Sequence, residues 1–492
     1  MIKKEVKNKQ EDRGDQKIIT KRGDDYSAWY ADVISGADLA EHSPVRGSMT
    51  IKPYGYAIWE IIQAVLDEKL KSLGVQNAYF PLFIPESFLK REAEHVEGFS
   101  PELAVVTHAG GKKLEEPLVV RPTSETIIYE SFSRWIQSYR DLPLVINQWA
   151  NVVRWELRPR LFIRTTEFLW QEGHTAHKTS EEARDYTFMI LNDVYRWFAE
   201  EYLAIPVYAG EKSESEKFAG AHKTFCIEAM MQDGKSLQVG TSHDLADNFA
   251  KSFDVAYLDK DGKKKNVYQS SWGVSTRLIG GIIMSHSDDK GLVLPPKIAP
   301  IQIVVIPIYK NKEDAVFLEA KKIFLSLSKK YRVKIDERLD LRPGEKYYEW
   351  EKKGVPIRIE IGPKDLLIRK CVLARRDTSD KISVELSEVD DQVFVVLENI
   401  QTKLFKNALL RREESNSVVN NLKEFEIAIE KGGYVFAYWC EDPKCEASIK
   451  EKTKATTRCR PFNTSDEQDE RECINCGKNV PGKKRWIFAK AY

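Results

Sequence analysis

Two short strand-like segments, separated only by an arginine-rich stretch, limit the possible folds of this 492-residue chain more than any other feature. They cover approximately residues 143–156 and 164–175, which is close enough for the two strands to pair. Because side chains alternate between the faces of a strand, Arg154 and Glu156 are expected on one face of the first segment. The second segment, TEFLWQEGH, is expected to present four side chains on one face: Phe168, Trp170, Glu172 and His174.

The stretch between these segments, LRPRLFIR, carries Arg158, Arg160 and Arg164 around a proline. Guanidinium groups bind phosphates through paired hydrogen bonds, and a carboxylate accepts hydrogen bonds from an amine. The two strands therefore suit the floor of an anion-binding pocket. A surface hairpin with solvated ion pairs is the alternative, but the aromatic side chains beside Glu172 and His174 favour a pocket.

The pattern of apolar residues divides the chain into parts. Residues 1–25 are charged and almost free of large apolar side chains, which predicts a flexible arm. A dense globular pattern follows over 26–297, with helices near 58–73 and 127–139 beside mostly antiparallel strands, which indicates an α+β domain. Three prolines within residues 294–300 indicate a linker.

After the proline-rich stretch the pattern changes to strand, helix and strand at 301–308, 313–331 and 355–361. This alternation predicts a small α/β domain over 298–404. A charged helix then leads into a third unit, residues 405–492, which contains spaced cysteines and ends on a tyrosine.

Three local features of the first domain add detail. Gly74 stands where the helix near 58–73 should end. Residues 78–84 form an apolar run that Pro81 interrupts, which suggests an edge or interface strand. Residues 211–235 are polar, and we expect them to precede another pair of strands.

Composition excludes several classes of protein. Lys and Arg total 76 and Asp and Glu total 75, so the net charge of +1 excludes a globally basic nucleic-acid coat or an acidic tail. A polyanion must therefore bind a local patch. No apolar run approaches the roughly 18 residues of a membrane span, and the first residues lack the apolar core of a secretory signal. We therefore expect a cytoplasmic protein.

Four of the seven cysteines have the spacing of a zinc site. Cys440 and Cys445 form one close pair, and Cys473 and Cys476 form another that a glycine follows. Four thiolates in two close pairs suit tetrahedral zinc in a reducing compartment, whereas free cysteines at chance spacing are the alternative. Cys459 is a possible substitute ligand. Cys226 and Cys371 are expected to be buried or inert.

Several other polar residues have both an ordinary and a functional interpretation. Thr123, Ser124 and Glu125 match the start of a helix, where a hydroxyl caps and an acid favours the first turn. Glu125 could equally hold a substrate ammonium group, and both roles are compatible. Arg277 opens a helix that contains two glycines, so it can bind a phosphate beside helix N–H donors. The stretch LQVGTSHD contributes Gln238, Thr241 and His243.

Taken together and in order, these segments resemble a class II aminoacyl-tRNA synthetase, specifically the prolyl-tRNA synthetases of the archaeal and eukaryotic-like type. The resemblance covers about residues 25–492. The first class signature matches the helix and strand through Pro81, the second matches Arg154-x-Glu156 with its loop and TEFLWQEGHTAH, and the third matches GVSTR, which ends at Arg277. RPTSET, LQVGTSHD and PGEKYYEWEKKGVPIRIEIGPKD are similar to the prolyl subgroup in particular.

The resemblance implies an antiparallel catalytic sheet ringed by helices, an α/β anticodon-binding domain and a small zinc-bearing α+β C-terminal domain. It also implies a homodimer built through the first signature. The implied reaction joins ATP and L-proline as prolyl-adenylate, with Mg²⁺ bridging phosphates, and then transfers proline to the terminal adenosine of proline tRNA.

By the same resemblance, individual residues receive roles. Arg154 and Arg277 would act in catalysis. ATP would contact Arg154, Glu156, Arg164, Gln238, Thr241, Ser275 and Arg277. Proline would contact Thr123, Glu125, Phe168, Trp170, Glu172, His174 and His243. Zinc would bind Cys440, Cys445, Cys473 and Cys476. The anticodon would contact Lys346, Glu351 and Arg358.

Two further implications concern fidelity and the chain end. Only about 60 residues separate His177 from Gln238, too few for an editing domain. The terminal Tyr492 resembles that of the family subtype, whose carboxylate folds back toward the active site, so its deletion is expected to lower activity more than stability.

Two alternatives stay open. One is a catalytically dead relative that senses tRNA or amino acids, although Arg154, Arg277 and Glu125 are all present. The other is an enzyme of the same fold for threonine or histidine, but the threonine enzyme is expected to bind catalytic zinc, and Cys226 has no second cysteine beside it in the first domain.

Overall fold

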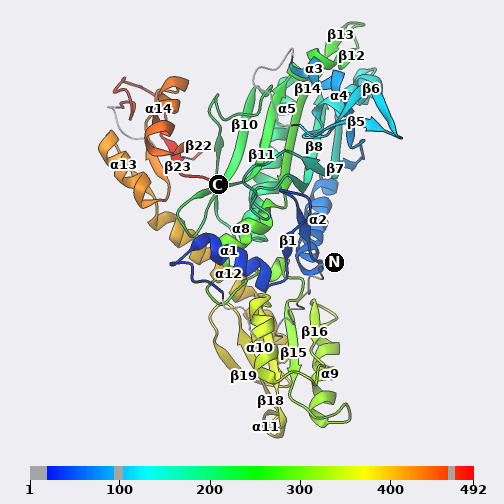
Figure 1. The fold of residues 1–492 in the computed structure, drawn as a ribbon, viewed down its shortest axis with the longest axis vertical. Helices are drawn as coiled ribbons and strands as arrows, with labels where there is room; N and C mark the ends of the chain where they lie inside the picture. Colours follow the sequence, from blue (N-terminus) through cyan, green and yellow to red (C-terminus); the bar gives the residue numbers. More distant parts are fainter. Residues whose placement is uncertain (1–18, 94–102, 464–470) are drawn as a thin grey trace, which may run out of the picture.

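The computed structural model describes residues 19–93, 103–463 and 471–492 (Figure 1). Most of the arm expected over residues 1–25 lies outside the described residues. The fold is mixed α+β, as predicted. Within the described ranges, none of the helices is both long and apolar enough to cross a membrane.

One large sheet runs through the molecule, and most of its neighbouring strands are antiparallel. The parallel pairs at its two ends are β20 with β21 and β3 with β7. In spatial order its strands are β20 (Ser417–Val418), β21 (Val435–Ala437), β23 (Trp486–Ala489), β22 (Thr456–Pro461), β9 (Val207–Glu211), β10 (Lys223–Met230), β11 (Ser236–Ala246), β14 (Tyr268–Ser275), β8 (Glu167–His177), β7 (Leu144–Val153) and β3 (Gln76–Asn77).

Helices and small sheets surround the central strands of this sheet. The helices are α1 (Tyr26–Gly36), α2 (Pro53–Ser72), α3 (Glu86–Ala93), α4 (Glu125–Trp135), α5 (Ser180–Met189), a π-helix (Ile190–Arg196), α6 (Trp197–Glu201), α7 (Asn248–Phe253) and α8 (Arg277–His286), with a 3-10 turn at Tyr139–Asp141. The small sheets pair β1 (Ala40–His42) with β2 (Met49–Ile51), β12 (Ala256–Leu258) with β13 (Lys264–Asn266), and β6 (Lys112–Val120) with β4 (Phe83–Pro85) and β5 (Val105–Ala109).

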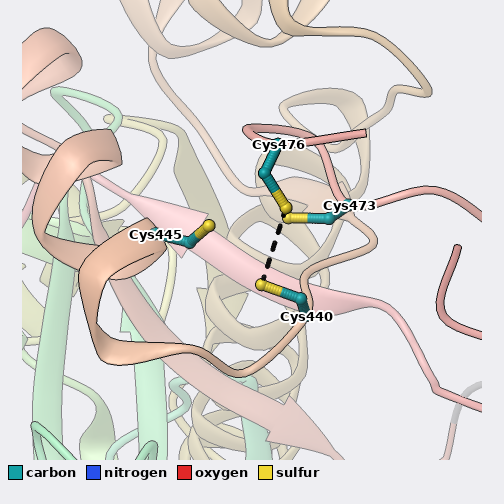
Figure 2. A group of neighbouring side chains, drawn as sticks. All are labelled: Cys440, Cys445, Cys473 and Cys476. Atoms are coloured by element: carbon teal, nitrogen blue, oxygen red, sulfur yellow. Dashed lines mark hydrogen bonds between the residues drawn. The ribbon is translucent and has the colours of Figure 1, made fainter. Parts of the chain in front are cut away.

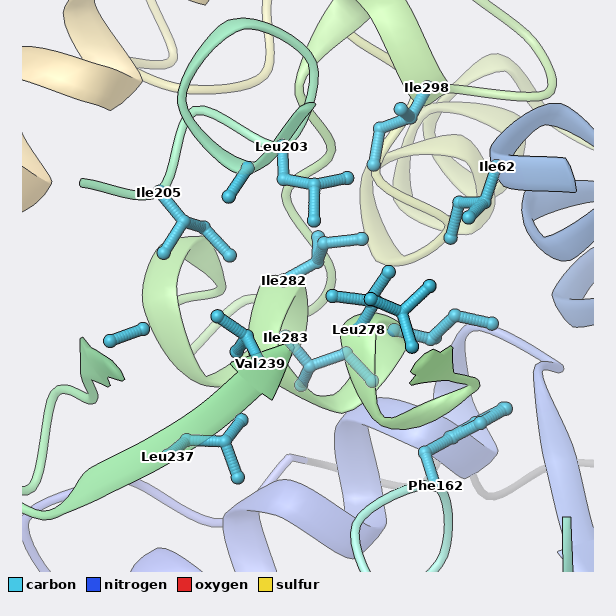
Figure 3. Close-up of a cluster of buried hydrophobic side chains, with 14 of the residues drawn as sticks. Ile62, Phe162, Leu203, Ile205, Leu237, Val239, Leu278, Ile282, Ile283 and Ile298 are labelled. Atoms are coloured by element: carbon cyan, nitrogen blue, oxygen red, sulfur yellow. The ribbon is translucent and has the colours of Figure 1, made fainter. Parts of the chain in front are cut away.

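The main core lies between the large sheet and α8. Leu237 and Val239 of β11 point toward Ile282 and Ile283 of α8 (Figure 3). Helix α2 adds side chains at helical spacing from the outside, and it ends before Gly74, whose φ of 83° is easy only for glycine. This packing fixes one face of the sheet and leaves the other face available for a site.

The proline-rich stretch 294–300 connects two units but is not a loose linker. It contains a 3-10 turn at Pro296–Ile298, and Leu294 and Ile298 are buried in the main core. Its prolines end the preceding elements, while its apolar residues still pack.

The α/β unit follows as a five-stranded sheet with helices, at the lower end of Figure 1. Its elements are β15 (Ile303–Pro307), α9 (Ala315–Leu327), β16 (Val333–Ile335), α10 (Pro343–Lys352), β17 (Ile357–Ile361), α11 (Pro363–Leu367), β18 (Lys370–Arg375) and β19 (Lys381–Glu385). The strand, helix and strand expected here are confirmed.

The long helix α12 (Val389–Glu414) crosses the boundary expected at residue 404 and leads back to the large sheet. The last unit adds α13 (Leu422–Lys431) and α14 (Pro443–Thr453). Its strands β20–β23 continue the sheet of the first domain, because β22 pairs with β9. The C-terminal unit thus extends the sheet of the first domain, which no local sequence pattern predicts.

Three local expectations need correction. The first strand of the arginine-bearing pair ends at Val153, so Arg154 and Glu156 lie beyond it. The polar stretch 211–235 contains β10 itself, in which Thr224 and Glu228 are buried. The run 78–84 is not one strand, since β3 ends before it and β4 begins within it; β4 is nevertheless an edge strand.

Candidate active site

A cavity of about 260 Å³ opens on the face of the large sheet opposite to α8. It is lined by the start of α4, the residue after β7, strands β8, β11 and β14, the start of α8, and a segment that follows β9. The predicted residues found in its lining are Thr123, Glu125, Arg154, Phe168, Trp170, Glu172, His174, Gln238, Thr241, His243, Ser275 and Arg277.

Strand register explains why these residues meet. In the middle strand β14, Ser271 lies between His174 of β8 and His243 of β11. Two residues on, Gly273 lies between Glu172 and Thr241. Small residues on the middle strand and large polar residues on its neighbours form a trough, because side chains two apart share a face.

One end of the trough is acidic and closely hydrogen-bonded. The carboxylate of Glu172 accepts hydrogen bonds from Ser124 Oγ at 2.5 Å and from Gln148 Nε2 at 2.8 Å, and His174 Nε2 lies 3.2 Å away. Burial raises the pKa of Glu172, but these partners outweigh burial and leave the pKa below its usual value. Glu125 is buried beside it and accepts a hydrogen bond from Thr123.

The capping interpretation of this segment is wrong for the hydroxyl groups. Ser124 occupies the N-cap of α4 without a side-chain cap hydrogen bond, because its hydroxyl donates to Glu172 instead. Thr123 likewise donates to the side chain of Glu125. The start of α4 therefore organises two carboxylates.

The other part of the trough is cationic. Arg154 donates from Nε to the carbonyl of Pro122 at 2.9 Å, and its guanidinium lies over the rings of Phe168 and Trp170. Arg277 donates from Nε to the carbonyl of Ile163 at 3.1 Å. Burial, followed by the positive charge of Arg154, lowers the pKa of Arg277 to about 10, so both groups are cations near neutral pH.

Three buried polar atoms of cavity-lining residues lack hydrogen-bond partners among the described residues: Trp170 Nε1, Ser271 Oγ and Trp272 Nε1. Buried polar groups are normally paired, so an unpaired donor in a cavity marks a place where a ligand can bind.

Glu156 and Arg164 do not line the cavity. They form an ion pair with each other, in which the Arg164 side chain is 62% exposed. Since β7 ends at Val153, no strand directs Glu156 to the side of Arg154. Their expected contacts with ATP stay predictions.

Sequence reasoning missed the segment that follows β9. Lys212, Glu216, Lys217 and Phe218 line the cavity, and the ring of Phe218 lies 4.8 Å from that of His243. These residues fall in the stretch interpreted as merely polar. They belong to no regular element, so periodicity carried no signal for them.

The four predicted zinc ligands lie together in the C-terminal unit. Their sulfur atoms are all within 4.8 Å of one another, and those of Cys440 and Cys476 are 4.0 Å apart (Figure 2). A tetrahedral zinc with Zn–S distances of about 2.3 Å requires sulfur atoms roughly 3.8 Å apart. The donor set and the spacing fit zinc.

The remaining cysteines are outside this cluster. Cys459 is buried in β22, next to Cys226 of β10, and is not one of the four grouped thiols. Cys371 is also buried, and burial raises the pKa of its thiol to about 12. A thiol with so high a pKa stays protonated and unreactive near neutral pH.

The three anticodon candidates do not share one surface. Glu351 and Arg358 line a second cavity together with Arg375 and Lys381. Lys346 is buried instead, and its Nζ donates to the carbonyl of Asp336 at 3.2 Å. Their roles stay predictions.

Tyr492 packs beside the start of β11 in the large sheet. Its hydroxyl donates to Asp233 at 2.6 Å, and its amide donates to the carbonyl of Ser236 at 3.2 Å. Its ring lies against the guanidinium of Arg160. The side chain is not part of the cavity lining, and the expected effect of deleting it stays a prediction.

Three histidines should make the protein sensitive to acid. Burial lowers the pKa of His243 to about 3 and those of His177 and His286 to about 4. Below about pH 6.5 these histidines bind protons in the unfolded chain, whereas in the folded chain they stay neutral down to about pH 4. The free energy of unfolding therefore decreases as the pH falls from about 6.5 to 4. Each histidine contributes a slope of up to about 1.4 kcal/mol per pH unit.

Urea unfolding at pH 7.5, 6 and 5 measures this slope. His286→Gln is the matched variant, because glutamine can still donate to the carbonyl of Leu203, which His286 Nε2 contacts at 2.8 Å. We expect a shallower slope in this variant. An unchanged slope would contradict the assignment of this histidine.

Three family models match this chain. The family model of the tRNA synthetase class II core domain (G, H, P, S and T) matches residues 107–286. The anticodon-binding domain matches 302–394, and the prolyl-tRNA synthetase C-terminal domain matches 422–492.

Similar proteins match over nearly their whole length. The proline–tRNA ligase of Chloroherpeton thalassium is 56% identical over 481 residues, which cover 96% of this chain and 99% of that protein. That of Chlorobaculum tepidum is 54% identical with the same coverage, and proline–tRNA ligase 2 of Clostridioides difficile is 52% identical over 96% of this chain and 98% of its own. The chain therefore belongs to the proline–tRNA ligase family of class II aminoacyl-tRNA synthetases.

Proposed function

We propose that this chain attaches L-proline to proline tRNA in two steps, through prolyl-adenylate with release of pyrophosphate. One observation carries the proposal: Arg154, Arg277 and Glu125, far apart in sequence, line one cavity. Cations suit the phosphates of ATP, and buried carboxylates suit the ammonium group of proline. A catalytically inactive sensor is not favoured, because none of these groups has been lost.

The chemistry requires positioning and charge neutralisation and no covalent enzyme intermediate. The proline carboxylate attacks the α-phosphate in line, and pyrophosphate leaves. Arg154 is assigned to the α-phosphate and Arg277 to the outer phosphates. Both arginines are held by backbone carbonyls, so little reorganisation is needed when charge develops. ATP enters as its magnesium complex, so this ion is part of the substrate.

Proline specificity is assigned to the acidic end of the trough. Glu125 and Glu172 face the cyclic ammonium group, and Phe168 and Trp170 flank the ring. His243 is neutral near pH 7, given its lowered pKa of about 3, so it offers one donor and one acceptor rather than a competing charge. Glu156 and Arg164 are assigned to adenine and outer phosphate, which requires ATP to separate their ion pair.

Alanine should be activated at a low but measurable rate. A pocket penalises each missing methylene by only about 1–3 kcal/mol, or roughly 10- to 200-fold. The chain between His177 and Gln238 forms packed elements of the catalytic unit, from α5 to β10, so we assign no editing domain there. Pyrophosphate exchange with alanine measures the activation of alanine, and deacylation of alanyl-tRNA tests for editing. Rapid deacylation by the purified protein would contradict the assignment of no editing domain.

Proline-dependent exchange of pyrophosphate into ATP tests the function itself. We expect proline to support exchange far better than alanine, cysteine or threonine, and proline tRNA to accept the product. Exchange that depends on another amino acid, or none with any amino acid, would refute the proposal.

The C-terminal cysteines are assigned to one structural zinc ion, held by Cys440, Cys445, Cys473 and Cys476. Bound zinc would cross-link the start of α14 to the turn at 473–476, because two ligands come from each side. Exposed apolar side chains at Tyr79 and Phe83 support a homodimer built near the first class signature. Light scattering should give twice the mass of one chain.

We retain the expected domain division: a catalytic domain over 26–297, an anticodon-binding domain over 298–404 and a zinc-binding domain over 405–492. Glu351 and Arg358 are assigned to the anticodon, because their cavity also contains Arg375 and Lys381. A cytoplasmic location is in keeping with free thiols and this function.

A further inference from the structure

Lys212 is a buried lysine in the cavity wall that the proposed mechanism does not use. Its side chain is 3% exposed, and its Nζ donates to Glu228 Oε1 at 3.0 Å. An ammonium group has three N–H donors, and burying a cation costs several kcal/mol unless it is paired. A lysine at this place needs an explanation beyond chance.

Glu228 of β10 is the hydrogen-bond partner that positions Lys212. Its carboxylate is fully buried and also accepts two hydrogen bonds from Arg458 Nη2 at 3.0 and 3.1 Å, one from Arg458 Nε at 3.2 Å and one from Ser236 Oγ at 2.7 Å. Burial raises the pKa of Glu228, but Arg458 and Lys212 outweigh it and lower the pKa to about 2. This carboxylate is saturated with donors and ionised, so it fixes the position of the lysine.

Arg458 belongs to the C-terminal unit, on β22, which pairs with β9 across the junction of the two units. The residue after Lys212 is also hydrogen-bonded to the C-terminal unit. Ser213 Oγ donates to Glu446 of α14 at 2.8 Å and lies 3.1 Å from Thr457 Oγ1. Glu446 directly follows Cys445 in sequence. The C-terminal unit therefore supports the segment that carries Lys212 through buried polar contacts.

Charge places Lys212 at the phosphate end of the trough. The charges of Glu228 and Arg458 are among those that shift the pKa of Arg277. The charges that shift the pKa of Arg154 are instead those of Glu125 and Glu172. Two cations, Lys212 and Arg458, share one carboxylate, so this group adds a net positive charge beside Arg277. An excess of positive charge in a partly enclosed cavity suits a polyphosphate.

We propose that Lys212 is a further ATP-contacting residue, which binds the leaving pyrophosphate, and that Arg458 of the C-terminal unit is its positioning residue through Glu228. This inference rests on the proposed function only for the identity of the ligand. The C-terminal unit thereby completes the catalytic cavity from outside the catalytic domain.

Binding of a non-hydrolysable ATP analogue, followed by calorimetry, tests the inference without catalysis. Lys212→Met should weaken binding by about 10- to 100-fold, because one charge-assisted hydrogen bond to phosphate is lost. In pyrophosphate exchange, the KM for ATP should rise or kcat fall, while the KM for proline changes less than about twofold. Lys212→Arg should restore part of the loss, and Arg458→Lys should produce a smaller loss of the same kind.

The matched control is Arg460→Met. Arg460 lies on the same strand as Arg458 and forms an ion pair with Glu211 across the same junction, but it does not contact Glu228. This variant should bind the analogue like the parent protein. Unchanged analogue binding in Lys212→Met would overturn the inference. Equal increases in the KM values for ATP and proline, together with lowered thermal stability, would also overturn it. Failure of the parent protein in proline-dependent exchange would instead refute the proposed function.

Discussion

Replacing Arg277 with alanine should lower the rate of proline-dependent pyrophosphate exchange by about 100- to 1,000-fold, which corresponds to roughly 3–4 kcal/mol of transition-state stabilisation. Arg277 opens α8 and lines the cavity with its Nε held by the carbonyl of Ile163. A charge held in place before the reaction stabilises the transition state more than the ground state. We therefore expect the main loss in kcat.

The control for this prediction is Arg164→Ala. Arg164 is mostly exposed and paired with Glu156, so its removal should cost less than that of Arg277. Thermal melting of both variants shows whether the fold persists. Near-normal exchange by a folded Arg277→Ala protein would show that the arginine does not act on the phosphates.

Replacing Cys473 with serine should abolish metal binding by the C-terminal unit. Four thiolates hold structural zinc with apparent free energies of about 10–16 kcal/mol near pH 7, and a missing ligand removes much of that stabilisation. Cys473 is buried among the four grouped thiols. We expect about one zinc per parent chain by elemental analysis, close to none in the variant, and a lower melting temperature.

Cys371→Ala is the matched control, because this buried thiol lies in the α/β unit and outside the cluster. It should keep the full metal content. Zinc retained at the parent level by Cys473→Ser, or a parent protein without bound metal after expression in zinc-supplemented medium, would contradict the assignment.

The sequence predicted those parts of the site that regular strands and helices carry. Alternation along β8 placed Phe168, Trp170, Glu172 and His174 on one face, and all four line the cavity. The register between strands, which brings Ser271 between two histidines, depends on pairing over long sequence distances and had no local signal.

The misses have physical causes. Glu228 of β10 is a charged residue in the stretch that was interpreted as polar. It is nevertheless fully buried, because Arg458, more than 200 residues away in the sequence, neutralises its charge. Lys212 lies in an irregular segment, where no periodicity exists to interpret. Glu156 was expected beside Arg154 because strand alternation was extended past the end of β7 at Val153. Proline-rich residues 294–300 mark the end of elements and do not imply exposure, since Ile298 is buried.

The C-terminal unit shows the same limit on a larger scale. Its cysteine spacing predicted the cluster correctly, because metal ligands in close pairs are a local pattern. Its pairing with the catalytic sheet through β22 and β9 is non-local and was not predicted. The function and the family could nevertheless be predicted from the sequence, because the motifs of the family occur in order along the chain.

The most direct test of the account is a crystal structure of the protein with a non-hydrolysable prolyl-adenylate analogue. We expect the group in place of the α-phosphate to contact Arg154 and the proline nitrogen to lie within hydrogen-bond distance of Glu125 or Glu172. Arg277 should face the space that pyrophosphate vacates. An analogue bound elsewhere, or bound here with its proline ring away from both carboxylates, would contradict the account.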